Sequence, residues 1–78
     1  MRAKQLKLIV TFHTTTAAMA MEKACTAAGL PGRLIPVPRE ITAGCGLSWK
    51  AEPSQKEALE AALTEHGMKW QEMHIIEI

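Results

Sequence analysis

A cysteine flanked by two glycines is the residue of this chain best suited to nucleophilic chemistry. Gly44, Cys45 and Gly46 follow the run RLIPVPRE over residues 33–40, which carries two prolines and ends in an Arg-Glu pair. A cysteine that only fills space usually has bulky apolar neighbours, and the two glycines remove such neighbours here. The pattern indicates an accessible thiol that can take part in sulfur exchange. A cysteine that points inward at the end of the core is the alternative that these residues leave open.

Three groups of side chains could assist this thiol. His13 follows the first apolar run and could tune or protonate it, although a solvent-facing position is the plainer interpretation. Arg33 and Arg39 could hold an anion at the start of a helix, or they could be surface charges on an edge strand. The helix start in question carries three hydroxyl residues, Thr14, Thr15 and Thr16.

The second cysteine, Cys25, is of a different kind. It shares an apolar helical stripe with Met21 and Ala28, which is typical of a cysteine packed in the core. A disulfide between Cys25 and Cys45 would turn the candidate thiol into a structural crosslink. Two cysteines in a short chain without an apolar leader instead indicate a reduced, cytoplasmic protein.

Composition limits the possible functions. The chain has 78 residues, is 47% hydrophobic and carries a formal net charge of +1, so we expect one domain over residues 1–78. This balance gives no general attraction to nucleic acid or to a membrane surface, and neither is expected as a partner. The three histidines and two cysteines lack the paired spacing of zinc ligands. No metal and no other cofactor is therefore expected.

Hydrophobic periodicity predicts an α+β fold. Alternating segments predict strands, and spacings of three and four residues predict two helices, the second with a capping box at residues 54–57. Pro36 and Pro38 favour a sheet edge for the second strand. The order β-α-β-β-α-β is that of a ferredoxin-like domain, with an antiparallel four-stranded sheet in the order 4-1-3-2, two helices on one face and an open second face. The predicted strands cover residues 6–12, 33–37, 45–51 and 70–78, and the helices residues 16–28 and 54–66.

This topology predicts the surroundings of Cys45. The third strand begins beside the end of the first, so Cys45 would open that strand near Phe12 and His13. The first turn of the first helix offers unpaired amide groups at the same end of the sheet, where Arg39 also leaves the second strand. Both features favour a thiolate.

Several of these residues also occur together in a known family. The chain resembles the selenium/sulfur carrier-like family of small bacterial domains over nearly its whole length, in FHTTT with Ala18, Met19, Glu22 and Gly29, in RLIPVPREI, and in Cys45-Gly46-Leu47. The resemblance implies a role near sulfur or selenium trafficking, with Cys45 as the carrier atom. It also extends to Arg33, Pro36, Pro38, Arg39 and Gly46, with residues 14–16 as neighbours. Thr42 stands where a serine is common, and Cys25 is outside the motif.

Three functions follow from these observations. The leading prediction is a non-catalytic carrier that holds a persulfide or selenosulfide on Cys45 and passes it from a donor protein to an acceptor protein. The second is a small anion-binding or regulatory module, in which Arg33, Arg39 and the helix start at residues 14–16 hold a metabolite beside Gly44 and Gly46, and Cys45 only shapes the pocket. The third is an interaction domain that forms a homodimer through its open sheet face.

Overall fold

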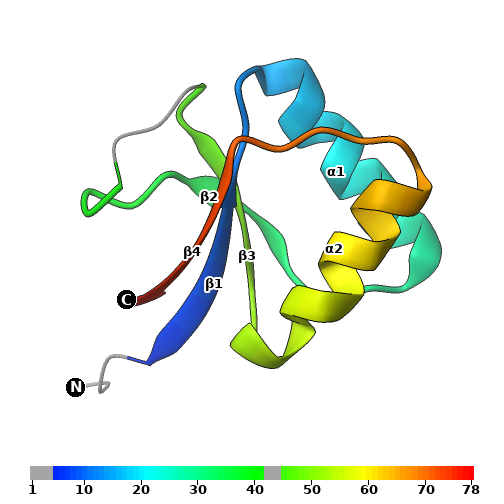
Figure 1. The fold of residues 1–78 in the computed structure, drawn as a ribbon. Helices are drawn as coiled ribbons and strands as arrows, with labels where there is room; N and C mark the ends of the chain where they lie inside the picture. The colour runs from blue at the N-terminus through cyan, green and yellow to red at the C-terminus, as the bar shows by residue number, and fades with distance from the viewer. Residues whose placement is uncertain (1–4, 42–44) are drawn as a thin grey trace.

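The computed structural model describes residues 5–41 and 45–78 and has the element order β-α-β-β-α-β (Figure 1). The antiparallel sheet has the order β2-β3-β1-β4, which is the predicted order read from the other edge. Both helices lie on one side of the sheet (Figure 1). The predicted α+β arrangement of one four-stranded sheet and two helices is therefore confirmed. Its elements are β1 (Leu6–Thr11), α1 (Thr15–Ala28), β2 (Arg33–Pro36), β3 (Leu47–Ala51), the 3-10 turn η1 (Pro53–Gln55), α2 (Lys56–Glu65) and β4 (Glu72–Glu77).

Strand β2 lies at an edge of the sheet, as its prolines predict. Within residues 5–41 and 45–78 it pairs only with β3, in a register that sets Arg33 opposite Lys50 and Pro36 opposite Leu47. Proline has no amide hydrogen to donate to a neighbouring strand, so an edge position leaves no ladder hydrogen bond unmade at Pro36.

The two helices begin in different ways. Thr14 caps α1, since its Oγ1 accepts a hydrogen bond from the Ala17 amide at 3.1 Å, and Gly29 ends α1 with a left-handed φ of 71°. The predicted capping box at the start of α2 is wrong, because Pro53 starts a 3-10 turn and no side chain caps the helix. The φ that proline imposes suits the first residue of a helical turn, so Ser54 is already helical and cannot adopt the extended backbone of a cap.

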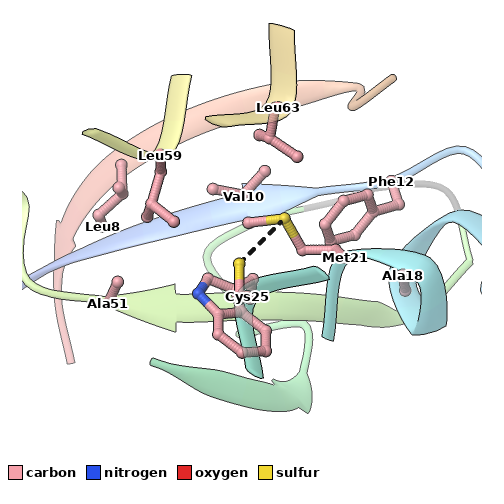
Figure 2. Close-up of a cluster of buried hydrophobic side chains, with 10 residues drawn as sticks. Leu8, Val10, Phe12, Ala18, Met21, Cys25, Ala51, Leu59 and Leu63 are labelled. Carbon is pink, nitrogen blue, oxygen red and sulfur yellow. Dashed lines mark hydrogen bonds between the residues drawn. The ribbon is translucent and has the colours of Figure 1, made fainter. Parts of the chain in front are cut away.

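The main core lies between the sheet and the two helices (Figure 2). Phe12 and Trp49 are buried there, so these two rings are not displayed on the surface. The sulfur atoms of Cys25 and Met21 lie 3.7 Å apart within α1. The ten buried residues of this cluster are Leu8, Val10, Phe12, Ala18, Met21, Cys25, Trp49, Ala51, Leu59 and Leu63.

The opposite face of the sheet is not open at its centre, which corrects the prediction. Ile9, Thr11 and Ser48 alternate with the core residues of their strands, yet each is 0% exposed. The segment that follows β2 lies on this side of the sheet, away from the helices (Figure 1), and its Ile41 is only 7% exposed. A second, smaller buried layer therefore covers the middle of the sheet.

Candidate functional site

Cys45 lies in a turn two residues before β3, and not in the strand itself as predicted. Gly46 has a left-handed φ of 83°, which interrupts extended backbone between Cys45 and Leu47. The Cys45 amide nevertheless donates a hydrogen bond of 3.3 Å to the carbonyl of Phe12. The turn is thereby attached to the end of β1, and the predicted proximity of Cys45 to Phe12 is confirmed.

The thiol of Cys45 is half-buried. Its side chain packs against the edge of the main core, and Sγ lies 3.7 Å from the carbonyl oxygen of Leu47, to which it can donate a weak hydrogen bond. Among the described residues, a Cβ added to the adjacent Gly46 would meet no atom within 4 Å. The side chain is thus held by the core, while the backbone next to it is open to an approaching molecule.

The first turn of α1 follows shortly after the residue that holds the Cys45 amide. His13 is exposed and joins Phe12, whose carbonyl holds the Cys45 amide, to Thr14, the cap of α1. Thr15 and Thr16 are exposed, and the first turn has no acidic residue. The partial positive charge of the helix start is therefore not balanced by a carboxylate within that turn.

The two arginines lie at different ends of the sheet. Arg39 is exposed in a turn after β2, which an Ile41 amide closes by donating to the Pro38 carbonyl at 3.0 Å. Among the described residues Arg39 and His13 form no hydrogen bond or ion pair through their side chains. Arg33 begins β2 opposite Lys50, and so lies at the other end of β2 and β3 from Cys45. Gly44, also among the predicted site residues, lies outside the described residues.

Backbone groups complete the surroundings of Cys45, and sequence reasoning missed them. The amide of Val37 donates to the carbonyl of Gly46 at 2.9 Å, which ties the segment after β2 to the turn before β3. The carbonyl of Leu47 faces the thiol. Main-chain donors and acceptors have no residue signature, so no sequence pattern identifies them. The only sequence feature that marks this contact is the end of the apolar run at Val37.

The two cysteines are separate and chemically distinct. Both are free thiols, and Cys25 is buried on α1 while Cys45 is half-buried in its turn. Burial raises the pKa of the Cys25 thiol above its ordinary value of 9.0. Cys25 therefore stays neutral and packs as a small apolar side chain, as its helical stripe predicts.

We expect the buried thiol to make stability depend on alkaline pH. Because the pKa of Cys25 is higher in the folded chain than in the unfolded chain, its stabilising contribution is complete below the unfolded value and is lost as the pH rises through the folded value. Urea denaturation of the wild type and of Cys25→Ala from about pH 8 to about pH 10.5 measures this effect. The difference in the free energy of unfolding between the two proteins should shrink as pH rises. A constant difference over that range would contradict the assignment.

The described part of the chain contains neither a metal-ligand cluster nor a helix that could span a membrane. In residues 5–41 and 45–78, no three histidine, cysteine, aspartate or glutamate side chains come together as a metal site would require. Over the same residues, neither helix has the length and apolar character needed to cross a membrane.

Comparison with known proteins identifies one family. Residues 7–75 match the family described as "Putative Se/S carrier protein-like", a range that contains Cys45 and the whole of α1, β2, β3 and α2. No curated protein and no solved structure matches the chain. Because the matched range covers most of the 78 residues, the chain belongs to the Se/S carrier protein-like family.

Proposed function

We propose that the protein is a carrier that holds a sulfur or selenium atom on Cys45 and passes it to an acceptor protein. The observation that carries this proposal is the setting of the cysteine: a free, half-buried thiol beside an open glycine backbone, attached to the end of β1 just before the start of α1. The family description points to the same role.

Loading and transfer are two thiol exchanges. The thiolate of Cys45 attacks the outer sulfur of a donor persulfide, a new S–S bond forms, and the donor's inner sulfur leaves as a thiolate. In the second exchange an acceptor thiolate attacks the same outer sulfur, and Cys45 leaves as a thiolate. The outer sulfur keeps its charge and oxidation level in both steps, so no external oxidant or reductant is needed. The amides of the first turn of α1, with Arg39 and His13, would stabilise the anionic outer atom.

The wider setting of this proposal follows from the chemistry. Both exchanges need free thiols on the carrier and on the acceptor, and thiols are kept reduced in the cytoplasm, so we assign the protein to the cytoplasm, with donor and acceptor proteins as its partners. The order of elements and strands supports a ferredoxin-like classification. A second copy of the chain could dock only on the rim of the sheet face away from the helices, because Ile9 at its centre is already buried.

An anion-binding module at the start of α1 is the weaker alternative. That function would need Arg33 and Arg39 to converge with Thr14 on one ligand. Arg33 begins β2 opposite Lys50, at the end of β3 farther from Cys45, and so cannot share a small ligand with the start of α1.

Sulfur loading measured by intact mass spectrometry tests the carrier proposal. The purified protein is incubated with a cysteine desulfurase and cysteine, and separately with glutathione persulfide as a donor that needs no protein recognition. We expect the wild type and Cys25→Ala to gain the mass of one sulfur atom, and Cys45→Ala to gain none. Adding an excess of a small thiol should then remove the extra mass, since its thiolate attacks the outer sulfur as an acceptor would and releases the Cys45 thiolate.

Two outcomes would count against the proposal. If Cys45→Ala still gains sulfur while Cys25→Ala does not, the reactive residue has been misassigned. If glutathione persulfide leaves the wild-type mass unchanged and Cys45 also reacts slowly with iodoacetamide, the thiol is too enclosed to carry sulfur. Loading by glutathione persulfide but not by the desulfurase would instead indicate that another protein is the donor.

A further inference from the structure

A small cationic cavity lies at the end of the sheet farther from Cys45, where β1 begins and β3 ends. Figure 1 shows these two strand ends in its lower part. Its volume is about 260 Å³, and Lys7, Arg33 and Lys50 line it together with Glu52 and the backbone at Gly32. The alpha carbons of Leu47 and Lys50 are three residues apart on β3, which separates them by roughly 10 Å. The cavity is therefore independent of the proposed carrier thiol.

One of the three cations is already paired. The Nζ atom of Lys7 lies 2.5 Å from Oε1 of Glu52, and only 16% of the Lys7 side chain is exposed. This ammonium group is thus held in place at the wall of the cavity, and its charge is balanced by the carboxylate.

The other two cations repel each other. Arg33 and Lys50 are direct partners in the antiparallel register of β2 and β3, so their side chains leave the sheet on the same face. Like charges in that position are destabilising. Neither side chain has an acidic partner within the described part of the chain. Two unbalanced positive charges therefore meet at one cavity, which is the arrangement expected where an anion completes the site.

We propose that this cavity binds the phosphate group of a small molecule. Two unbalanced cations match a dianion, and a planar guanidinium beside an ammonium is a common pair for phosphate oxygens. The cavity is smaller than the roughly 300–1,000 Å³ of sites for drug-sized ligands, so free phosphate or a short phosphate monoester fits and a nucleotide does not.

Gly32 lines the cavity and lies against the indole of Trp49, whose N–H can report on binding. This residue has a φ of 124°, and a Cβ placed on it would lie 2.3 Å from Nε1 of Trp49. Within the described residues that Nε1 is buried and has no hydrogen-bond partner. An anion held at the wall formed by Gly32 would therefore shift the indole N–H resonance of Trp49.

Titration followed by 15N NMR tests the site, with inorganic phosphate in one arm and glycerol 3-phosphate in the other. We expect saturable shifts of the Trp49 indole and of the Arg33 and Lys50 amides in at least one arm, and the tighter arm identifies free phosphate or a monoester as the source. Arg33→Gln and Lys50→Gln should each weaken binding by about tenfold or more, since each removes a charge-assisted hydrogen bond. Lys56→Gln, on an exposed helix position, is the matched control and should bind as the wild type does.

Folding is checked in the same variants without phosphate. Arg33→Gln and Lys50→Gln remove a like-charge repulsion, so neither should lower the midpoint of urea denaturation. The proposal is overturned if sodium chloride of equal ionic strength produces the same shifts in the wild type, or if neither phosphate arm saturates. It is also overturned if the folded Arg33→Gln and Lys50→Gln variants bind as tightly as Lys56→Gln.

Discussion

Gly32→Ala is expected to destabilise the protein by about 2–6 kcal/mol, which combines overpacking with backbone strain. The added Cβ would lie 2.3 Å from Nε1 of Trp49 and 2.7 Å from the carbonyl oxygen of Lys50. Real Cβ atoms do not approach other atoms so closely, and Trp49 is 2% exposed within the core, so the ring has little room to move. Overpacking of this kind costs about 1–3 kcal/mol. A side chain at a φ of 124° adds about 1–3 kcal/mol of backbone strain.

Gly29→Ala is the matched control for this substitution. Gly29 also has a positive φ, 71°, but a Cβ there would meet no atom within 4 Å. Only the left-handed conformation is penalised, at about 1–2 kcal/mol. Urea denaturation of both variants should therefore show a clearly larger loss of unfolding free energy for Gly32→Ala. Equal losses would mean that Trp49 does not lie against the Gly32 backbone.

Ile9→Ala is expected to cost about 2–5 kcal/mol, as for other fully buried large side chains. Ile9 lies on the sheet face away from the helices, where a two-layer arrangement would leave it exposed and such a substitution would matter little. It is instead 0% exposed. The segment after β2 lies on this side of the sheet (Figure 1), and its Ile41 is buried. Replacing the Ile9 side chain with a methyl group should therefore leave a cavity beneath this segment.

Ile75→Ala controls for the intrinsic preference of isoleucine for strands. Ile75 belongs to β4 and is 46% exposed, so its truncation should cost less than about 1 kcal/mol. Both variants replace an isoleucine in a strand with alanine, so the difference in their free energies of unfolding, measured by denaturant unfolding, reports the difference in burial. If Ile9→Ala and Ile75→Ala cost the same, the segment after β2 does not cover the sheet in solution.

Much of the fold could be predicted because its signals are local. Alternation of side chains marks strands, and a threonine before an apolar stripe with a glycine after it marks the ends of α1. Pro36 favours an edge strand, and this agrees with the strand order that the β-α-β-β-α-β pattern predicts and the structure has. The prediction for α2 was wrong at its first turn because two local preferences competed there, and Pro53 took precedence over Ser54.

The candidate site was predicted only in part. The antiparallel pairing of β1 and β3 brings Cys45 to Phe12, and the strand order alone is enough to predict this. From the sequence, Arg33 is, together with Arg39, a candidate anion ligand at the start of α1. The register of β2 and β3 instead sets it opposite Lys50, at the other end of the strand. Proximity along the chain does not establish proximity across a sheet.

The sequence by itself determined the type and approximate position of each strand and helix, the order of the strands and the family, since periodicity, turn residues and motif residues are properties of neighbours along the chain. The tertiary structure alone decided how far Cys45 is buried, that Ile9 is covered, and that Lys7, Arg33 and Lys50 meet at one cavity. These properties depend on which distant segments pack over a given side chain. Packing of that kind follows from the shapes and register of the whole fold, and no short stretch of sequence contains it.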